Sequence, residues 1–248
     1  MIDRHEVGEG RRLAGPGTVR TVKVVLLHAL PLDASMWDSV CDGLDAEVLV
    51  PTLYGLGTSV GAWAAAVVDL AGPGPLVVVG NSVGGSCAIE MVHLAPDRVR
   101  ALVLIGTKAG HRPEPAVRDG AIELLTNEGM AGAWPVLWAP LFAPGADPAV
   151  VDHARRMAMA VPSDEVIGGV RAFHARADRT EVLESYAGPV VVVRGEHDRI
   201  PRHPVELAAG LRHGTFHQVD GAGHYVPLDR PEFTRRLIAD ALEVAASR

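Results

Sequence analysis

The chain has 248 residues, and its 48% hydrophobic content is enough to bury one sizeable domain with an insertion. Its net charge of −7, without any cluster of lysine or arginine, predicts that it has no nucleic-acid partner. Its two cysteines are too few for a disulfide framework, and no cysteine or histidine spacing typical of a metal site occurs.

The first 20 residues are polar and rich in glycine, with a weak pattern for a hairpin about residues 8–10 or 15–17. They lack the basic and then apolar stretches of a signal peptide. No apolar run reaches the length that a membrane span needs. We therefore expect a cytoplasmic protein without a membrane partner.

Buried strands and helices are expected to alternate over the next part of the chain. Short apolar runs rich in β-branched residues predict strands, and longer segments with apolar residues three or four apart predict helices. Strands are expected over residues 21–27, 47–50, 76–79 and 99–105, and helices over residues 35–44 and 61–70 and in the segment that ends before Pro96. This alternation is typical of βαβ units that build a parallel sheet with both faces covered.

The alternation stops after Gly110, and no strand pattern occurs between residue 113 and about residue 186. Helical patterns fill this segment, at residues 116–125, 132–138, 148–160 and 163–177. The alternation then returns, with strands at residues 190–193 and 215–219 and helices at residues 204–211 and 231–246. We therefore expect an α/β core formed by residues 1–110 and 187–248, with residues 111–186 inserted as a helical cap.

The turn after the strand at residues 76–79 carries a G-x-S-x-G sequence, formed by Gly80, Ser82 and Gly84. This sequence has a functional meaning only between a strand and a helix, which is its place here. Glycine on both sides allows a sharp turn that leaves the serine protruding at the helix N-terminus, where free N–H groups favour a developing negative charge. We interpret Ser82 as a nucleophile. The alternative is a turn that only joins the strand to the helix.

Asp198 and His224 each follow a later strand, so both are expected at the same edge of the sheet as Ser82. A serine hydroxyl needs an imidazole to take its proton and a buried carboxylate to orient that imidazole. The chain order serine, aspartate, histidine is the order found in α/β-hydrolases. We interpret Asp198 as the acid and His224 as the base of a catalytic triad.

Other carboxylates compete with Asp198 for this role. Glu196, Asp220 and Asp229 are rival acids in the same part of the chain, and Asp198 has an alternative role as a turn or N-cap residue before Pro201. The sequence leaves these alternatives open.

A nucleophilic serine also needs hydrogen-bond donors for the negative charge on the former carbonyl oxygen. One donor is expected to be the backbone N–H of Val83, directly after the nucleophile, and the second that of Leu30, in the loop after the first strand. His28 in the same loop is interpreted as a brace for the loop rather than as a base. This chemistry implies no metal ion and no organic cofactor.

These motifs resemble those of α/β-hydrolase-fold enzymes of the group that contains 3-oxoadipate enol-lactonases and small carboxylesterases. The matching segments are HALPLDASMW at residues 28–37, GNSVGG at residues 80–85, LFAP at residues 141–144, GEHD at residues 195–198 and GAGH at residues 221–224. The resemblance implies an α/β-hydrolase fold with a mostly parallel sheet flanked by helices. It also implies the roles given above for Ser82, Asp198, His224, Leu30 and Val83.

The chain departs from the family pattern at three places. Ala29 stands where the family usually has glycine, and Asn81 replaces the common histidine before the nucleophile. The loop at residues 54–59 keeps the family's glycines without its usual arginine and histidine. The resemblance therefore does not define the substrate.

We expect a hydrolase for a small carboxylic ester, lactone or thioester that acts through an acyl-enzyme on Ser82, with a small-molecule substrate as its partner. One alternative is a C–C-bond hydrolase, or a non-hydrolytic lyase or cyclase, with the same triad. Another is a ligand-binding protein without catalysis. The sequence makes no prediction of an oligomeric state.

The cap contains Trp134, Trp138, Phe142 and Phe173, although aromatic residues make up only 4% of the chain. These four side chains are expected either to wall an apolar substrate pocket over Ser82 or to pack the cap helices together.

Overall fold

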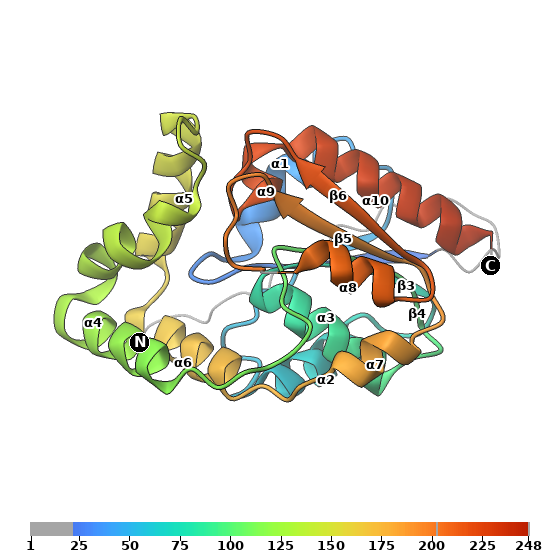
Figure 1. Cartoon of the computed structure of the whole chain (residues 1–248), viewed down its shortest axis with the longest axis horizontal. Helices are drawn as coiled ribbons and strands as arrows, with labels where there is room; N and C mark the ends of the chain where they lie inside the picture. Colours follow the sequence, from blue (N-terminus) through green and yellow to red (C-terminus); the bar gives the residue numbers. More distant parts are fainter. Residues whose placement is uncertain (1–21, 202, 248) are drawn as a thin grey trace, which may run out of the picture.

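The computed structural model describes residues 22–201 and 203–247 (Figure 1). The hairpin expected near residues 8–17 lies outside the described residues. Six strands form one sheet in the order β2-β1-β3-β4-β5-β6, and each neighbouring pair is parallel. The strands are β1 Lys23–Leu27, β2 Val48–Leu49, β3 Leu76–Asn81, β4 Val99–Ile105, β5 Val190–Gly195 and β6 Gly214–Val219. Each lies within two residues of the strand expected from the sequence.

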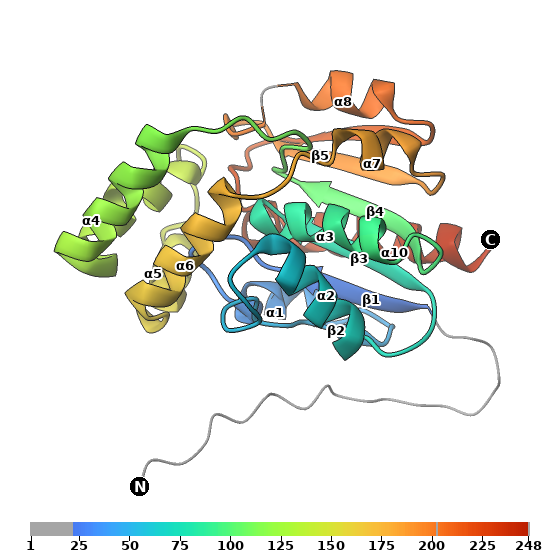
Figure 2. The ribbon, with the colours of Figure 1, turned by 90° about the horizontal axis from the view of Figure 1, so that it is seen from below.

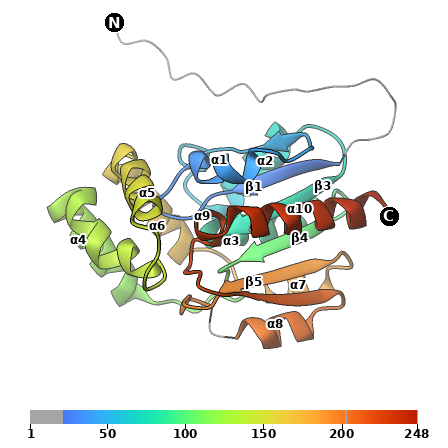
Figure 3. The same ribbon diagram turned by 90° about the horizontal axis from the view of Figure 1, so that it is seen from above.

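Helices cover both faces of the sheet (Figures 1 and 3). One face carries α1 Asp38–Cys41, α9 Val226–Asp229 and α10 Pro231–Ala246, and the other carries α2 Val60–Leu70, α3 Val83–Leu94, α7 Thr180–Ser185 and α8 Pro204–Gly210. Strand side chains alternate between the two faces: Val24 and Leu26 lie in the cluster under α10, and Val25 and Leu27 in the cluster under α3. Because both faces are buried there, the strands at the centre of the sheet, β1, β3 and β4, consist mainly of apolar residues.

Local signals explain most helix boundaries. α5 Pro148–Ala160 and α10 have the bounds expected from the sequence, and each begins with a proline, whose fixed φ suits the first helical turn. The helix expected at residues 35–44 is shorter and irregular: a 3-10 turn, Ala34–Trp37, is capped by the Asp33 carboxylate and runs into α1. α7 and α9 were not expected, because four to six residues contain too little periodicity to be recognised.

Residues between β4 and α7 form helices beyond the carboxyl ends of the strands, where α4, α5 and α6 lie together (Figures 2 and 3). α4 spans Pro115–Ala133 with a break at Gly129, whose φ is 64°, and α6 spans Ser163–His174. Trp134–Trp138 forms a π-helical turn and Ala139–Leu141 a 3-10 turn. α7 packs on α3 beside the sheet rather than with α4 to α6 (Figure 2). The limits of core and cap stay a prediction.

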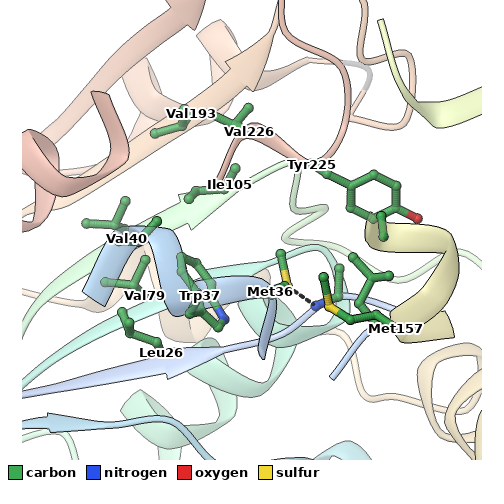
Figure 4. Close-up of a cluster of buried hydrophobic side chains, with 14 of the residues drawn as sticks. Leu26, Met36, Trp37, Val40, Val79, Ile105, Met157, Val193, Tyr225 and Val226 are labelled. Carbon is green, nitrogen blue, oxygen red and sulfur yellow. Dashed lines mark hydrogen bonds between the residues drawn. The ribbon is translucent and has the colours of Figure 1, made fainter. Parts of the chain in front are cut away.

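The helical segment shares a hydrophobic core with the sheet. Met157 from α5 belongs to the same buried cluster as Val79 and Ile105 from the sheet (Figure 4). Met36 lies between them, and Tyr225 lies at the same end of the cluster as Met157 (Figure 4). The helices beyond the carboxyl ends of the strands therefore share one hydrophobic core with the sheet.

Within the described part of the chain, no helix combines the length and the hydropathy that a membrane crossing needs.

Candidate active site

Ser82 lies in a strained turn between β3 and α3. Its φ is 57° and its ψ is −116°, and among the described residues it is the only one other than glycine with a positive φ. Its N–H donates to the carbonyl of Ile105 at the end of β4, at 2.8 Å, which ties the turn to the sheet. A side-chain-bearing residue adopts this conformation only where its surroundings impose it, and such strain is concentrated at functional sites.

The two glycines that flank Ser82 are required by close backbone contacts. A Cβ atom on Gly84 would lie 2.6 Å from the carbonyl carbon of Leu27 and 2.7 Å from the carbonyl oxygen of His28. A Cβ atom on Gly80 would overlap the backbone of Gly84 and Gly85. The strand, the turn and the helix therefore approach one another too closely for any side chain at these positions.

Asp198 and His224 form a buried pair at the same edge of the sheet. Nδ1 of His224 lies 2.8 Å from Oδ2 of Asp198, and the two side chains are 3% and 1% exposed. A carboxylate only accepts hydrogen bonds, so Nδ1 carries the proton and Nε2 is left as the basic nitrogen. The second carboxylate oxygen, Oδ1, accepts the N–H of Ile200 at 2.9 Å. The carboxylate thereby fixes both the orientation and the tautomer of the imidazole.

The rival acids hold the backbone of the histidine loop instead. Oε2 of Glu196 accepts the N–H of Gly221 at 2.8 Å, and Oδ2 of Asp229 accepts the N–H of Gly223 at 2.7 Å. Burial raises the pKa of Asp229 above its ordinary value. Neither carboxylate is hydrogen-bonded to the imidazole of His224, and Asp220 makes no side-chain hydrogen bond with the described residues. Of the four candidates, the structure thus brings only Asp198 to the histidine ring.

The histidine loop is held by the residue before Ser82 and by the residue after β4. The side-chain N–H₂ of Asn81 donates to the carbonyl of His224 at 3.1 Å and to that of Ile105 at 3.0 Å. Gly106 follows β4, with a φ of 58°, and a Cβ atom there would lie 2.8 Å from Nδ1 of His224 and 2.9 Å from Oδ2 of Asp198. The residues next to Ser82 and the residue after β4 therefore define where the histidine lies. The hydroxyl of Ser82 makes no hydrogen bond with the residues that the structure describes, so it is free to face a ligand.

The loop at Ala29 and Leu30 presents one free donor. The N–H of Ala29 donates to Sδ of Met36 at 3.3 Å, and the carbonyl of Leu30 accepts the Tyr225 hydroxyl at 3.1 Å. Neither the N–H of Leu30 nor that of Val83 has a partner among the described residues. Both expected oxyanion donors are therefore available.

His28 braces this loop, in agreement with its predicted role. Its Nε2 accepts the N–H of Leu53 at 2.9 Å, so Nδ1 carries the proton and donates to the carbonyl of Ala29 at 3.1 Å. The ring is 1% exposed, and burial lowers its pKa to about 4. A neutral imidazole with both nitrogens occupied does not act as a base.

The four aromatic residues expected in the cap lie in two different places. Trp134, Trp138 and Phe142 are buried in the core cluster, with the rings of Trp134 and Phe142 6.2 Å apart. Phe173 lines a cavity of about 700 Å³ between the segment after β4, α7 and α8, with Arg176 stacked 4.0 Å over its ring. Thr107 is also part of the cavity wall, and its hydroxyl lies 3.4 Å from the carbonyl of Ser82. The described residues contain no group of three or more metal-ligating side chains.

The sequence reasoning missed Tyr225, Met36 and the role of Asn81. Tyr225 follows His224 directly, which was the one available signal. The contact of Met36 with Ala29 and the reach of Asn81 to His224 join residues whose spacing in the chain carries no motif.

A family model described as "Alpha/beta hydrolase family" matches residues 24–237 of the chain. The curated relatives include polyketide synthase ThaQ of Burkholderia thailandensis, which is 29% identical over 241 residues, covering 86% of this chain and 11% of that protein. Lipase LipV of Mycobacterium tuberculosis is 34% identical over 118 residues, 42% of each chain. Esterase Rv0045c of the same organism is 26% identical over 250 residues, covering 89% of this chain and 83% of the relative. The chain thus spans only a small part of ThaQ and less than half of LipV.

Among solved structures, an esterase from Thermogutta terrifontis is 26% identical, with a TM-score of 0.82 over 91% of this chain and 90% of the other. The enol-lactonase from Burkholderia xenovorans has a TM-score of 0.81 at 21% identity, over 94% of this chain and 95% of the other. At this level of identity, the likeness to the enol-lactonase is a likeness of fold.

Proposed function

Because this chain belongs to the alpha/beta hydrolase family, we propose that it hydrolyses a small carboxylic ester, lactone or thioester through an acyl-enzyme on Ser82. The predicted fold class and the predicted resemblance to esterases and lactonases of this fold are confirmed. Ester hydrolysis is the activity that the names of the relatives support. One esterase among the curated relatives and one among the solved structures each align over most of the chain.

The buried hydrogen bond between His224 and Asp198, at 2.8 Å beside the Ser82 turn, is the observation that carries this proposal. A ligand-binding protein has no use for an imidazole whose tautomer is fixed by a buried carboxylate. A serine nucleophile needs that arrangement, because its hydroxyl must lose a proton as it attacks.

In the proposed first step, Nε2 of His224 takes the proton of the Ser82 hydroxyl while Oγ attacks the carbonyl carbon of the substrate. Asp198 stabilises the imidazolium that forms. The negative charge on the former carbonyl oxygen is held by the free N–H groups of Leu30 and Val83. The imidazolium then gives its proton to the departing alcohol, thiol or ring oxygen, and the acyl group stays on Ser82.

In the proposed second step, water attacks the acyl-enzyme. His224 takes a proton from the water, and the same two N–H groups hold the second oxyanion. The bond to Oγ breaks, the hydroxyl of Ser82 recovers its proton from His224, and the carboxylic acid leaves. Neither step requires a metal ion or an organic cofactor.

We propose that the substrate lies between the Ser82 turn and the helices of residues 111–186. Phe142 contacts Tyr225, with ring centroids 5.0 Å apart, and the carbonyl of Leu141 accepts the N–H of His224 at 2.8 Å. This part of the cap therefore lies against the catalytic histidine. Trp134 and Trp138 pack in the same buried cluster as Phe142. Phe173 lines the cavity that Thr107 also lines.

The test compares two serine variants on α3 and its N-terminal turn. Ser82→Ala should abolish turnover of an aryl ester such as p-nitrophenyl butyrate. Ser86→Ala should leave it unchanged, because the hydroxyl of Ser86 is buried without a hydrogen-bond partner and contacts no reacting group. A fluorophosphonate probe should label Ser82 in the wild-type protein and in Ser86→Ala, with the adduct located by mass spectrometry.

The alternative functions give different results. A C–C-bond hydrolase, lyase or cyclase would leave no acyl group on Ser82 when its substrate is supplied. With an esterase, an acyl group on Ser82 can be trapped when the reaction is stopped at low pH. A non-catalytic binding protein would not react with the fluorophosphonate although it is folded. Turnover by Ser82→Ala at the wild-type rate would refute the acyl-enzyme mechanism.

A further inference from the structure

The backbone around Leu30 is held by side chains from three different parts of the chain. His28 donates to the carbonyl of Ala29, Met36 accepts the N–H of Ala29, and Tyr225 donates to the carbonyl of Leu30. We refer to His28, Met36 and Tyr225 as the Leu30 clamp. Of the four backbone polar groups of Ala29 and Leu30, the clamp occupies three and leaves only the N–H of Leu30 without a partner.

The geometry of the peptide group makes this arrangement specific. The carbonyl of Ala29 and the N–H of Leu30 belong to one planar peptide group and point in opposite directions. A hydrogen bond that fixes the carbonyl therefore also fixes the direction of the N–H. The bond from Tyr225 fixes the next peptide group, so the backbone on both sides of the Leu30 Cα atom is held.

Tyr225 also joins this loop to the catalytic histidine and to the cap. Its ring lies 5.4 Å from that of His224, edge on, and 5.0 Å from that of Phe142. The residue is 0% exposed. Burial, together with the charge of Asp198, holds the pKa of Tyr225 well above its usual range, so its hydroxyl stays a donor. Figure 4 shows Tyr225 at the end of the core cluster nearest Met157 and Met36, whose sulfur carries the dashed hydrogen bond.

We propose that Tyr225 is a positioning residue of the oxyanion site, which with Met36 and His28 preorganises the Leu30 N–H for the transition state. This inference rests on the proposed function. A preorganised donor contributes more to the transition state than to substrate binding, because the full negative charge exists only in the former. Loosening the clamp should therefore lower kcat and leave KM nearly unchanged.

The main test is Tyr225→Phe, which keeps the ring and its contacts and removes only the hydroxyl. The expected result is a fall in kcat for an aryl ester of about tenfold, less than the 10²–10³ that the loss of a whole donor costs. KM should stay within about twofold. The affinity for an alkyl boronic acid, which adds to Ser82 as a tetrahedral anion, should fall by the same factor as kcat, whereas the affinity for a planar carboxylic acid product should not change.

The matched control is Tyr186→Phe. Tyr186 is also a buried tyrosine whose hydroxyl donates to a backbone carbonyl, that of Val99 at 3.0 Å. Val99 begins β4, so this bond lies at the edge of the sheet opposite the site. The free energy of unfolding should fall by a similar amount in both variants, whereas kcat should fall only in Tyr225→Phe. An equal loss of kcat in the two variants would mean that Tyr225 acts through stability alone.

The pH profile separates an effect on the oxyanion from one on the base. If Tyr225 acts through the Leu30 N–H, kcat of Tyr225→Phe should be lower than that of the wild type at every pH, and the pH at the midpoint of its kcat profile should be unchanged. A shifted midpoint would mean that the hydroxyl acts through His224, and would overturn the inference. Met36→Leu, nearly equal in volume, provides a second variant should Tyr225→Phe fold poorly, and should show the same pattern with a smaller fall.

Failure of this inference is distinguishable from failure of the proposed function. If Tyr225→Phe turns over like the wild type while Ser82→Ala is inactive, only the positioning role is refuted. If Ser82→Ala remains active, the acyl-enzyme mechanism is refuted and the clamp loses its role with it.

Discussion

Acid should destabilise this protein through His28, a residue that takes no direct part in the proposed chemistry. The ring is buried and neutral, with Nε2 accepting from Leu53 and Nδ1 donating to Ala29. Burial lowers its pKa from 6.5 to about 4, although the bond to Ala29 and the charge of Asp33 oppose the shift. A proton on Nε2 would remove the acceptor that the N–H of Leu53 needs.

The direction of this pH effect follows from the protonation of His28 in the unfolded and folded states. Below pH 6.5 the unfolded chain binds a proton at His28, whereas the folded protein does so only near pH 4. The stabilisation is therefore complete above pH 6.5 and is lost as the pH falls toward 4. A pKa of about 4 in place of 6.5 corresponds to about 3 kcal/mol in total, of which about 2 kcal/mol is lost between pH 8 and pH 5. This is a large part of the 5–15 kcal/mol typical of a domain.

The assay is urea unfolding at several pH values from 8 to 5, for the wild type and for His28→Gln. Glutamine retains a donor and an acceptor and does not titrate. Burial also lowers the pKa values of His111 and His174, but their contributions are the same in both proteins and cancel in the difference. The free energy of unfolding of the wild type should fall by about 2 kcal/mol more than that of His28→Gln. If the free energy of unfolding depended equally on pH in the two proteins, His28 would not be a source of the acid sensitivity.

Three further predictions concern other residues of the site. Asp198→Asn should lower kcat by about 10⁴ with little change in fold, because an amide holds the wrong tautomer of His224; steady-state kinetics and circular dichroism check this. Gly84→Ala should prevent stable folding, since its Cβ atom would overlap the backbone of Leu27 and His28. The control is Gly120→Ala, at an exposed position of α4 where a Cβ atom would have no neighbour within 4 Å. This control should raise the free energy of unfolding in urea by up to about 1 kcal/mol. Asn81→Ala should cost about 1–3 kcal/mol and also lower kcat, because it leaves the buried carbonyl of His224 without its donor, whereas that of Ile105 still accepts the N–H of Ser82. An unchanged kcat would show that His224 is held without Asn81.

The strands and the Ser82 turn could be predicted because their signals are local. A buried strand needs an apolar run, and a strained turn between strand and helix needs glycine, so the residues concerned lie together in the chain. The same holds for α5 and α10, which begin at prolines. The break in α4 at Gly129 and the π-helical turn after it depend instead on how the helices after β4 pack together, and the sequence indicated neither.

The amino-acid pattern was enough to predict the parallel α/β architecture, the place of Ser82 at the edge of the sheet and the set of residues from which an acid and a base could come. It favoured Asp198 through the chain order serine, aspartate, histidine, but it could not show which of the four carboxylates reaches the His224 ring, because that depends on how two loops meet. The folded chain shows that Asp198 is the carboxylate that reaches the ring, and it reveals Tyr225, whose hydroxyl donates to a carbonyl 195 residues away in the chain. Hydrogen bonds of this kind join backbone groups that carry no side-chain signal, so they arise from the packing of the loops and leave no motif to read.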